Sequence, residues 1–295
     1  MTSSATAGAS RDSRFVRRGT FESGDGRQIA FTDYVEGSEP MLFVQGLSLS
    51  GDFWLDTPGT VRATQKDVRP LLIDNRGTGR SRHTQAPRSL SVLADDCASL
   101  LDFLKIDRAW VVGLSMGGMV AQHLALRHPA RVRGLVLVAT SACVRAGPWP
   151  TVKIMRTLAH GILARPRSLD PLAALLLGPA DRSRATSLLT PFARLAAKTP
   201  TPRTTVLAQL AAVASHDTRR SLRRLTCPTE ILAGDADALL PAAHSHALAQ
   251  IIPTARCTIF PGVGHGLPLC APTAIPDAVE RLIRAPSRAR DENIG

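Results

Sequence analysis

The sequence lacks any long hydrophobic run. Its apolar stretches, such as Leu135–Ala139, are far shorter than the roughly 20 residues that a membrane-spanning helix requires. The first residues, Met1–Ser13, are small and polar and contain no apolar segment of the kind that secretory signal peptides carry. We therefore predict a cytoplasmic protein with no membrane partner. Residues 1–14 are predicted to form a disordered lead-in.

Cysteine is scarce, and its spacing is uninformative. The five cysteines form neither an even set nor a C-x-x-C pair; they are Cys97, Cys143, Cys227, Cys257 and Cys270. A disulfide framework and a zinc site are both disfavoured by this pattern, so we expect reduced thiols and no metal. With 295 residues, 44% hydrophobic and 20% charged, the chain is long enough to form a full hydrophobic core without cross-links.

Acidic residues are nearly missing from one part of the chain. Between Val144 and Leu225 there are 14 Lys or Arg residues and three acidic ones, while the whole chain has a net charge of +12. A field of one sign concentrates partners of the opposite charge, which indicates an anionic substrate or an acidic carrier protein. Solvated helix faces are the alternative interpretation. Aromatic residues are not interleaved with the basic ones and no nucleic-acid motif is present, so we expect no nucleic-acid partner.

The order of apolar patterns predicts an α/β fold. Residues Phe15–Leu42 alternate apolar and polar side chains between glycines, which is typical of an antiparallel hairpin. Short buried-type strands then alternate with helical patterns, and such alternation favours a mostly parallel sheet flanked by helices. The predicted strands are Met41–Val44, Pro70–Ile73, Trp110–Val112, Val132–Val138, Thr229–Leu232 and Arg256–Phe260, and the predicted helices are Ser91–Leu104, Met116–Arg127 and Ala242–Ile251.

A long interruption separates two of these strands. Residues 143–226 contain no convincing strand and four amphipathic stretches divided by prolines and glycines: Thr151–Leu163, Pro171–Leu177, Arg182–Ala197 and Thr204–Ser215. We interpret this segment as an all-helical lid, or cap, inserted into one core formed by residues 15–142 and 227–285. The last residues, 286–295, are predicted to form a flexible tail.

The strongest chemical signal is the sequence Gly113-Leu114-Ser115-Met116-Gly117-Gly118. It lies between a predicted strand and a predicted helix, which is the context that the G-x-S-x-G nucleophile elbow requires. The serine of such an elbow occupies a strained turn at a helix N-terminus, where free N–H groups favour a developing anion. Ser115 is therefore the candidate nucleophile, and a glycine-rich helix cap is the alternative.

A serine hydroxyl is a weak nucleophile and needs a general base that a carboxylate orients. Of eight histidines, His265 is the candidate base, because it lies in a glycine-rich loop directly after the strand that ends at Phe260. His123 and His128 lie on the helix that follows Ser115, where packing or solvation explains them. The sequence shows no partner for the histidines in the other helical patterns, which are His160, His216, His244 and His246.

The candidate acid follows the strand Thr229–Leu232, where two carboxylates are available. Asp237 is favoured because it lies beyond the turn, just before the next helix, whereas Asp235 is placed to bond turn backbone. The resulting chain order of nucleophile, acid and base is typical of this architecture.

Acyl transfer also needs two N–H donors for the oxyanion, and losing one such donor typically lowers the rate by roughly 100 to 1,000-fold. One candidate is the backbone N–H of Met116, directly after the nucleophile. The other is the N–H of Leu47, in the loop after the strand Met41–Val44. Ser48 and Ser50 either tighten this loop through hydrogen bonds or are simply polar residues of an exposed loop.

Taken in order, these segments resemble the α/β-hydrolase superfamily over roughly Val16 to Arg284, and most of all its serine esterase, lactonase and haloperoxidase-like (perhydrolase) branch with a helical cap. A further match is Asp74-Asn75-Arg76-Gly77-Thr78-Gly79-Arg80-Ser81, which is similar to the D-x-R-G-x-G-x-S turn near the site of these enzymes. Relatives usually have His-Gly at the oxyanion loop, where this chain has Gln45-Gly46. A Gln side chain can still hydrogen-bond loop backbone, so we expect the turn to survive.

The resemblance implies a serine hydrolase that cleaves a carboxylic ester, lactone or thioester with neither cofactor nor metal. The substrate would be a small acyl compound, anionic or bound to a carrier protein, and cap residues would line its pocket: Leu158, Ile162, Leu175, Leu176, Phe192 and Leu195. Two alternatives stay open at this point. The same site could serve a cyclase, acyltransferase or perhydrolase, or the fold could be a non-catalytic ligand-binding module. The sequence leaves the acyl group, the leaving group and the oligomeric state open.

Overall fold

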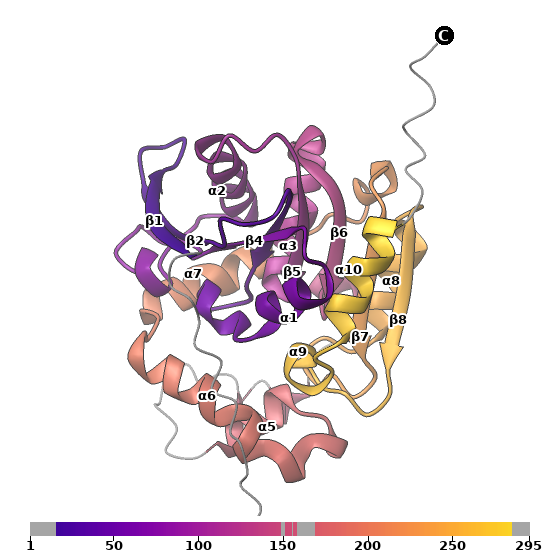
Figure 1. The fold of residues 1–295 in the computed structure, drawn as a ribbon. Coiled ribbons are helices and arrows are strands. Elements are labelled where there is room, and N and C mark those ends of the chain that lie inside the picture. Colours follow the sequence, from indigo (N-terminus) through magenta and orange to yellow (C-terminus); the bar gives the residue numbers. More distant parts are fainter. Residues whose placement is uncertain (1–15, 149–150, 155, 158–168, 285–295) are drawn as a thin grey trace, which may run out of the picture.

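The computed structural model describes residues 16–148, 151–154, 156–157 and 169–284 (Figure 1). In these residues one sheet of eight strands has the order β1-β2-β4-β3-β5-β6-β7-β8. The strands are β1 (Arg17–Glu22), β2 (Gln28–Asp33), β3 (Glu39–Val44), β4 (Val68–Ile73), β5 (Ala109–Leu114), β6 (Val132–Val138), β7 (Thr229–Gly234) and β8 (Ala255–Phe260). The pairs β1–β2 and β2–β4 are antiparallel and the other pairs are parallel. The predicted mostly parallel sheet is therefore confirmed.

Helices cover both faces of this sheet. The helices of the core are α1 (Thr57–Thr64), α2 (Leu90–Phe103), α3 (Met116–Arg127), α8 (Ala243–Ile251), α9 (Leu267–Cys270) and α10 (Ala274–Arg284). Because successive side chains of a strand point to opposite faces, Leu42 and Val44 of β3 pack with α2 and α3, whereas Met41 and Phe43 pack with α1 and α10. Two apolar layers thus form the core, one on each side of the sheet.

Helices α1, α9 and α10 were not among the helices predicted from the sequence. In α10 the buried side chains of Ile275, Val279 and Leu282 recur at the spacing of one helical face, so the signal was present in the sequence. Helix α1 carries Pro58 and Gly59 in its first turn, and these residues hide its short pattern.

The residues between β6 and β7 include several helices and, where the structure describes them, no strand. We call residues 143–226 the cap segment; it holds α5 (Asp170–Leu176), α6 (Ala185–Lys198) and α7 (Arg203–Ala214). Figure 1 shows α5 and α6 together at one end of the sheet. Helix α7 returns to the core, where its Ala212 is buried in the same apolar layer as α2 and α3. Most of the helix expected at Thr151–Leu163, the lead-in and the tail lie outside the described residues.

A membrane-spanning helix would have to be long and apolar. Within the part of the chain that the structure describes, no helix meets both conditions.

Candidate active site

Ser115 lies in the turn that joins β5 to α3. Its backbone has φ 55° and ψ −119°, a conformation that costs a residue with a side chain roughly 1–3 kcal/mol. The surrounding structure holds it there, because its N–H donates to the Val138 carbonyl at 2.8 Å and its own carbonyl accepts from the Thr140 hydroxyl at 2.7 Å. The Ser115 side chain stays partly exposed while its neighbours along the chain are buried.

The two outer glycines of the elbow are explained by close backbone contacts. A Cβ atom on Gly117 would lie 2.0 Å from the Val44 carbonyl oxygen, and one on Gly113 would lie 2.4 Å from the Gly117 carbonyl oxygen. Both distances are far too short for atoms that are not bonded to each other, so any side chain here would push α3 away from the sheet. The motif therefore keeps the strand, the turn and the helix in contact.

His265 and Asp237 form a buried pair. His265 Nδ1 lies 2.7 Å from Asp237 Oδ2, and the other carboxylate oxygen accepts the backbone N–H groups of Leu239 and Leu240 at 2.8 and 2.9 Å. The Asp237 side chain is fully buried and His265 is 7% exposed. Since a carboxylate can only accept, the bond places the proton of a neutral imidazole on Nδ1 and leaves Nε2 as the basic atom.

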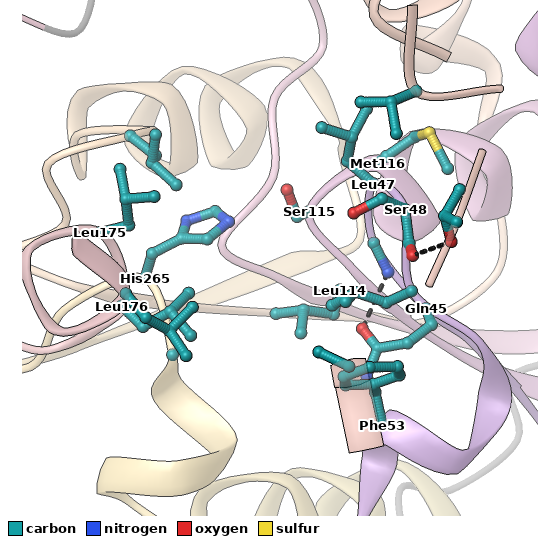
Figure 2. Close-up of a pocket in the computed structure, with 18 of the residues that line it drawn as sticks. Gln45, Leu47, Ser48, Phe53, Leu114, Ser115, Met116, Leu175, Leu176 and His265 are labelled. Carbon is teal, nitrogen blue, oxygen red and sulfur yellow. Dashed lines mark hydrogen bonds between the residues drawn. The ribbon is translucent and has the colours of Figure 1, made fainter. Parts of the chain in front are cut away.

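The basic edge of His265 faces Ser115. Both residues line the same cavity, and Figure 2 shows the imidazole ring directed toward the Ser115 hydroxyl. Among the described residues no hydrogen bond joins the two side chains. Catalytic hydrogen bonds are often long without substrate and shorten when it binds. The structure thus brings to one cavity the two residues that the sequence predicts to act as nucleophile and base.

The neighbouring carboxylate has a different environment. Asp235 Oδ1 accepts the backbone N–H of Gly262 at 2.6 Å, and this bond ties the loop after β7 to the loop after β8. Asp235 does not bond His265 in the structure.

Three other histidines, His123, His216 and His244, have hydrogen-bond partners that the sequence did not reveal. His216 lies 3.2 Å from His123, ring nitrogen to ring nitrogen, and its second nitrogen contacts the Ser141 carbonyl at 3.1 Å. His244 Nδ1 lies 2.9 Å from the Ser141 hydroxyl. None of the three is among the described residues that line the cavity beside Ser115.

The loop that the sequence predicts to bind the oxyanion, residues 45–51, follows β3, and we call it the oxyanion loop. Gln45 Oε1 accepts the backbone N–H of Gly46 at 2.8 Å (Figure 2), so this residue does hydrogen-bond its own loop. The Gln45 carbonyl accepts from Asn75 Nδ2 at 3.2 Å. Leu47 and Met116 both line the cavity beside Ser115, and Met116 is the first residue of α3, where N–H groups have no partner within the helix.

The segment Asp74–Ser81 braces this loop. Asp74 accepts the backbone N–H groups of Gly51 and Arg80, each at 2.9 Å, and burial raises the pKa of its carboxyl while the charge of Arg80 opposes the rise. Asn75 supplies the bond to the Gln45 carbonyl. Its segment was recognised in the sequence, but this role of the Asn75 side chain was not predicted.

The cavity has a volume of about 1350 Å³ and a mostly apolar lining. Leu175, Leu176 and Phe192 of the cap segment line it, as expected, whereas Leu195 does not; Leu158 and Ile162 lie outside the described residues. The charged side chains among the described lining residues are Arg145 and Arg203. The site therefore offers a large apolar chamber with basic groups at its wall.

The described residues contain no group of three side chains suited to hold a metal ion.

Burial raises the pKa of the Cys97 thiol far above its usual range, so this cysteine carries no thiolate nucleophile at neutral pH.

Comparison with known proteins gives consistent matches. Residues 39–269 match the alpha/beta hydrolase fold family. A Caulobacter sp. (strain K31) protein, provisionally named carbamate hydrolase RutD, is 32% identical over 82% of this chain and 89% of its own length. The pimeloyl-[acyl-carrier protein] methyl ester esterase of Nitrosomonas europaea is 32% identical over 76% of this chain and 88% of its own. The solved structure of a hydrolase from Pseudomonas aeruginosa PA01 has a TM-score of 0.74 and 28% identity, and the match covers 91% of this chain and 99% of that one.

Proposed function

The chain belongs to the α/β-hydrolase fold family and is a hydrolase, and from that premise we propose that it cleaves a carboxylic ester, lactone or thioester through an acyl-enzyme on Ser115. The observation that carries the proposal is the bond between His265 Nδ1 and Asp237, which leaves Nε2 directed toward the Ser115 hydroxyl across the cavity. A neutral imidazole in this orientation can accept the serine proton.

The proposed first step acylates Ser115. Its Oγ forms a bond to the substrate carbonyl carbon while the hydroxyl proton passes to His265 Nε2, and the carbonyl π electrons move onto oxygen. The N–H groups of Leu47 and Met116 would stabilise this oxyanion. When the carbonyl re-forms, the bond to the leaving group breaks, and His265 returns its proton to the departing alcohol or thiol.

The second step releases the acid by the same route. His265 takes a proton from water as the water oxygen attacks the acyl carbon, and the proton returns to Ser115 Oγ when that bond breaks. Asp237 stabilises the imidazolium that forms in both steps. The cap segment would cover the chamber and exclude bulk water from it.

Ser115→Ala tests the nucleophile. We expect loss of nearly all turnover of p-nitrophenyl esters and loss of covalent labelling by a fluorophosphonate, with unchanged thermal unfolding. A Ser115→Ala protein that hydrolysed these esters like the wild type would remove Ser115 from the mechanism. An unlabelled wild-type protein would instead favour the non-catalytic alternative.

The acceptor is tested by product analysis. A panel of esters, lactones and acyl thioesters should give free acids as products. Acyl transfer to an added amine or alcohol in preference to water, or cyclisation, would replace hydrolysis by the transferase or cyclase alternative.

We further propose that the substrate is anionic or carried by an acidic protein. The support is the excess of basic residues in the cap segment, the presence of Arg145 and Arg203 at the cavity wall, and the carrier-protein substrate in the name of the Nitrosomonas relative. The kcat/KM for a carrier-bound acyl thioester should fall with rising ionic strength, because salt screens such attraction, while that for a neutral ester should not. Equal salt dependence of the two substrates would contradict the proposal.

A further inference from the structure

The backbone of Ser48 is bound on both sides by the cap segment. Its N–H donates to Gln209 Oε1 at 2.7 Å, and its carbonyl accepts the hydroxyl of Thr201 at 2.7 Å. Gln209 belongs to α7, and Thr201 lies in the connection just before it. Ser48 directly follows Leu47 in the oxyanion loop (Figure 2), so two cap residues more than 150 positions away in sequence hold the neighbour of the proposed oxyanion donor.

Ser48 needs this support because its backbone is strained. It has φ 61°, in the left-handed region, which costs a residue with a side chain roughly 1–2 kcal/mol. Two bonds to its peptide groups can offset a cost of that size, since each is worth roughly 0.5–1.5 kcal/mol. Without them we expect Ser48 to relax to a negative φ and to rotate the peptide groups beside it.

Gln209 is built into this contact at a cost. Its side chain is fully buried, and its Nε2 atom has no hydrogen-bond partner in the described structure. A buried donor without a partner destabilises a protein by roughly 1–3 kcal/mol. The hydrogen bond that the side chain does make is the one from Ser48, so this bond is the evident structural role of a polar residue here.

The other end of the oxyanion loop is held by the core. Asn75 binds the Gln45 carbonyl, and Gln45 itself accepts from the Gly46 N–H. Leu47 therefore lies between a half of the loop fixed by the core and a half fixed by the cap segment. The direction of its N–H depends on both.

We propose that Thr201 and Gln209 are positioning residues that orient the Leu47 N–H, so that docking of the cap segment on the core completes the oxyanion hole. The inference rests on the proposed function. It adds that the cap segment takes part in transition-state stabilisation as well as in binding. The cavity is also lined by Thr201 and Val206 of the cap segment. A substrate that contacts these residues and holds them against the core would at the same time fix the direction of the Leu47 N–H.

Thr201→Val tests the proposal, because valine has nearly the shape of threonine but no hydroxyl. An oxyanion donor acts mainly in the transition state, so kcat should fall about tenfold or more, a part of the roughly 100 to 1,000-fold that loss of the whole donor costs, while KM stays within about threefold. Thr201→Ser, which keeps the hydroxyl, should restore kcat to within about twofold of the wild type.

Thr190→Val is the matched control. Thr190 also lies in the cap segment, but its hydroxyl bonds the Thr186 carbonyl of its own helix. This variant should keep the wild-type kcat. If Thr190→Val lowered kcat as much as Thr201→Val, the effect would be a general loosening of the cap segment and the proposal would be wrong.

Gln209→Met removes the acceptor for the Ser48 N–H and also the unpartnered donor. It should lower kcat like Thr201→Val without lowering the melting temperature by more than a few degrees. The double variant should lose less than the product of the two single effects, since both residues hold the same loop conformation. Fully multiplicative effects would show two unrelated contributions and would contradict the proposal.

Two further measurements separate this inference from the proposed function. Hydrogen exchange of the peptide around Leu47 and Ser48 should be faster in Thr201→Val than in Thr190→Val, and affinity for a trifluoromethyl ketone, whose adduct carries an oxyanion, should fall in parallel with kcat. Wild-type labelling of Ser115 with an unchanged kcat in Thr201→Val would overturn the inference alone. A wild-type protein that neither reacts with fluorophosphonate nor binds the ketone would overturn both.

Discussion

Asp237 is held on both of its carboxylate oxygens, and this sets what a substitution will do. Oδ1 accepts from Leu239 and Leu240, so an asparagine at this position would keep its oxygen there and turn its NH2 group toward His265. That donor favours the imidazole tautomer with its proton on Nε2, the atom that must accept the serine proton. We expect Asp237→Asn to lower kcat/KM by about 10,000-fold while thermal unfolding changes little, measured with p-nitrophenyl esters.

Asp235→Asn is the control in the same loop. Its oxygen accepts from Gly262, and an asparagine oxygen can accept the same bond. Its kcat/KM should stay within tenfold of the wild type. A larger loss in Asp235→Asn than in Asp237→Asn would exchange the two assignments.

The residues of the proposed triad could be chosen from the sequence because each follows a recognisable strand. Ser115 carries a local motif, and His265 and Asp237 each occupy a turn just beyond an apolar run. Thr201 and Gln209 gave no such signal. Their bonds to Ser48 join segments that only the folded chain brings together, and neither residue belongs to a pattern that would distinguish it from other polar residues of the cap segment.

At the level of elements, the end of α5 forms a tight seam with the loop that carries His265. The Leu176 carbonyl accepts the N–H of Gly266 at 2.7 Å, and a Cβ atom on Gly178 would lie 1.8 Å from the Gly262 carbonyl oxygen. Gly178→Ala must therefore displace one of the two backbones. We expect it to destabilise the protein by roughly 1–3 kcal/mol and to lower kcat/KM, measured by urea unfolding and ester turnover.

Gly59→Ala is the matched substitution. Gly59 lies in α1, and nothing would approach an added Cβ within 4 Å. This variant should stabilise the protein by roughly 0.5–1 kcal/mol, because alanine favours the helix, and should leave turnover unchanged. If Gly178→Ala instead had the stability to urea and the ester turnover of Gly59→Ala, α5 would not be packed on the His265 loop as the structure shows.

Elements with strong apolar patterns were predictable, and their contacts were not. The strands of the parallel part of the sheet, β3 to β8, were located within a few residues, because buried parallel strands are short apolar runs. The helices of the cap segment were also recognised where the structure describes them. The contacts of these helices with the oxyanion loop and the His265 loop were not predicted. They consist of backbone contacts and single polar hydrogen bonds, which produce no periodic pattern in a sequence.

Acid stability is a property of the whole molecule that one buried pair should influence. Burial, together with the neighbouring His123, lowers the pKa of His216 to about 4, against a bond to the Ser141 carbonyl that opposes the shift. The pair joins α3 of the core to the end of the cap segment. The charged groups nearest to it are Asp217 beside His216, and Arg127 and Asp95 beside His123.

The sign of the effect follows from proton uptake. An unfolded histidine has a pKa of about 6.5, so between pH 6.5 and 4 the unfolded chain binds a proton that the folded chain does not. The free energy of unfolding should therefore decrease as pH falls through this window, and the contribution of His216 should be constant above it. In His216→Gln, which can still donate to the Ser141 carbonyl but does not titrate, urea unfolding at several pH values should show a smaller decrease than in the wild type. Parallel curves for the two proteins would mean that His216 is protonated equally in the folded and unfolded chains, and the acid sensitivity of the fold would then have to come from its buried carboxylates.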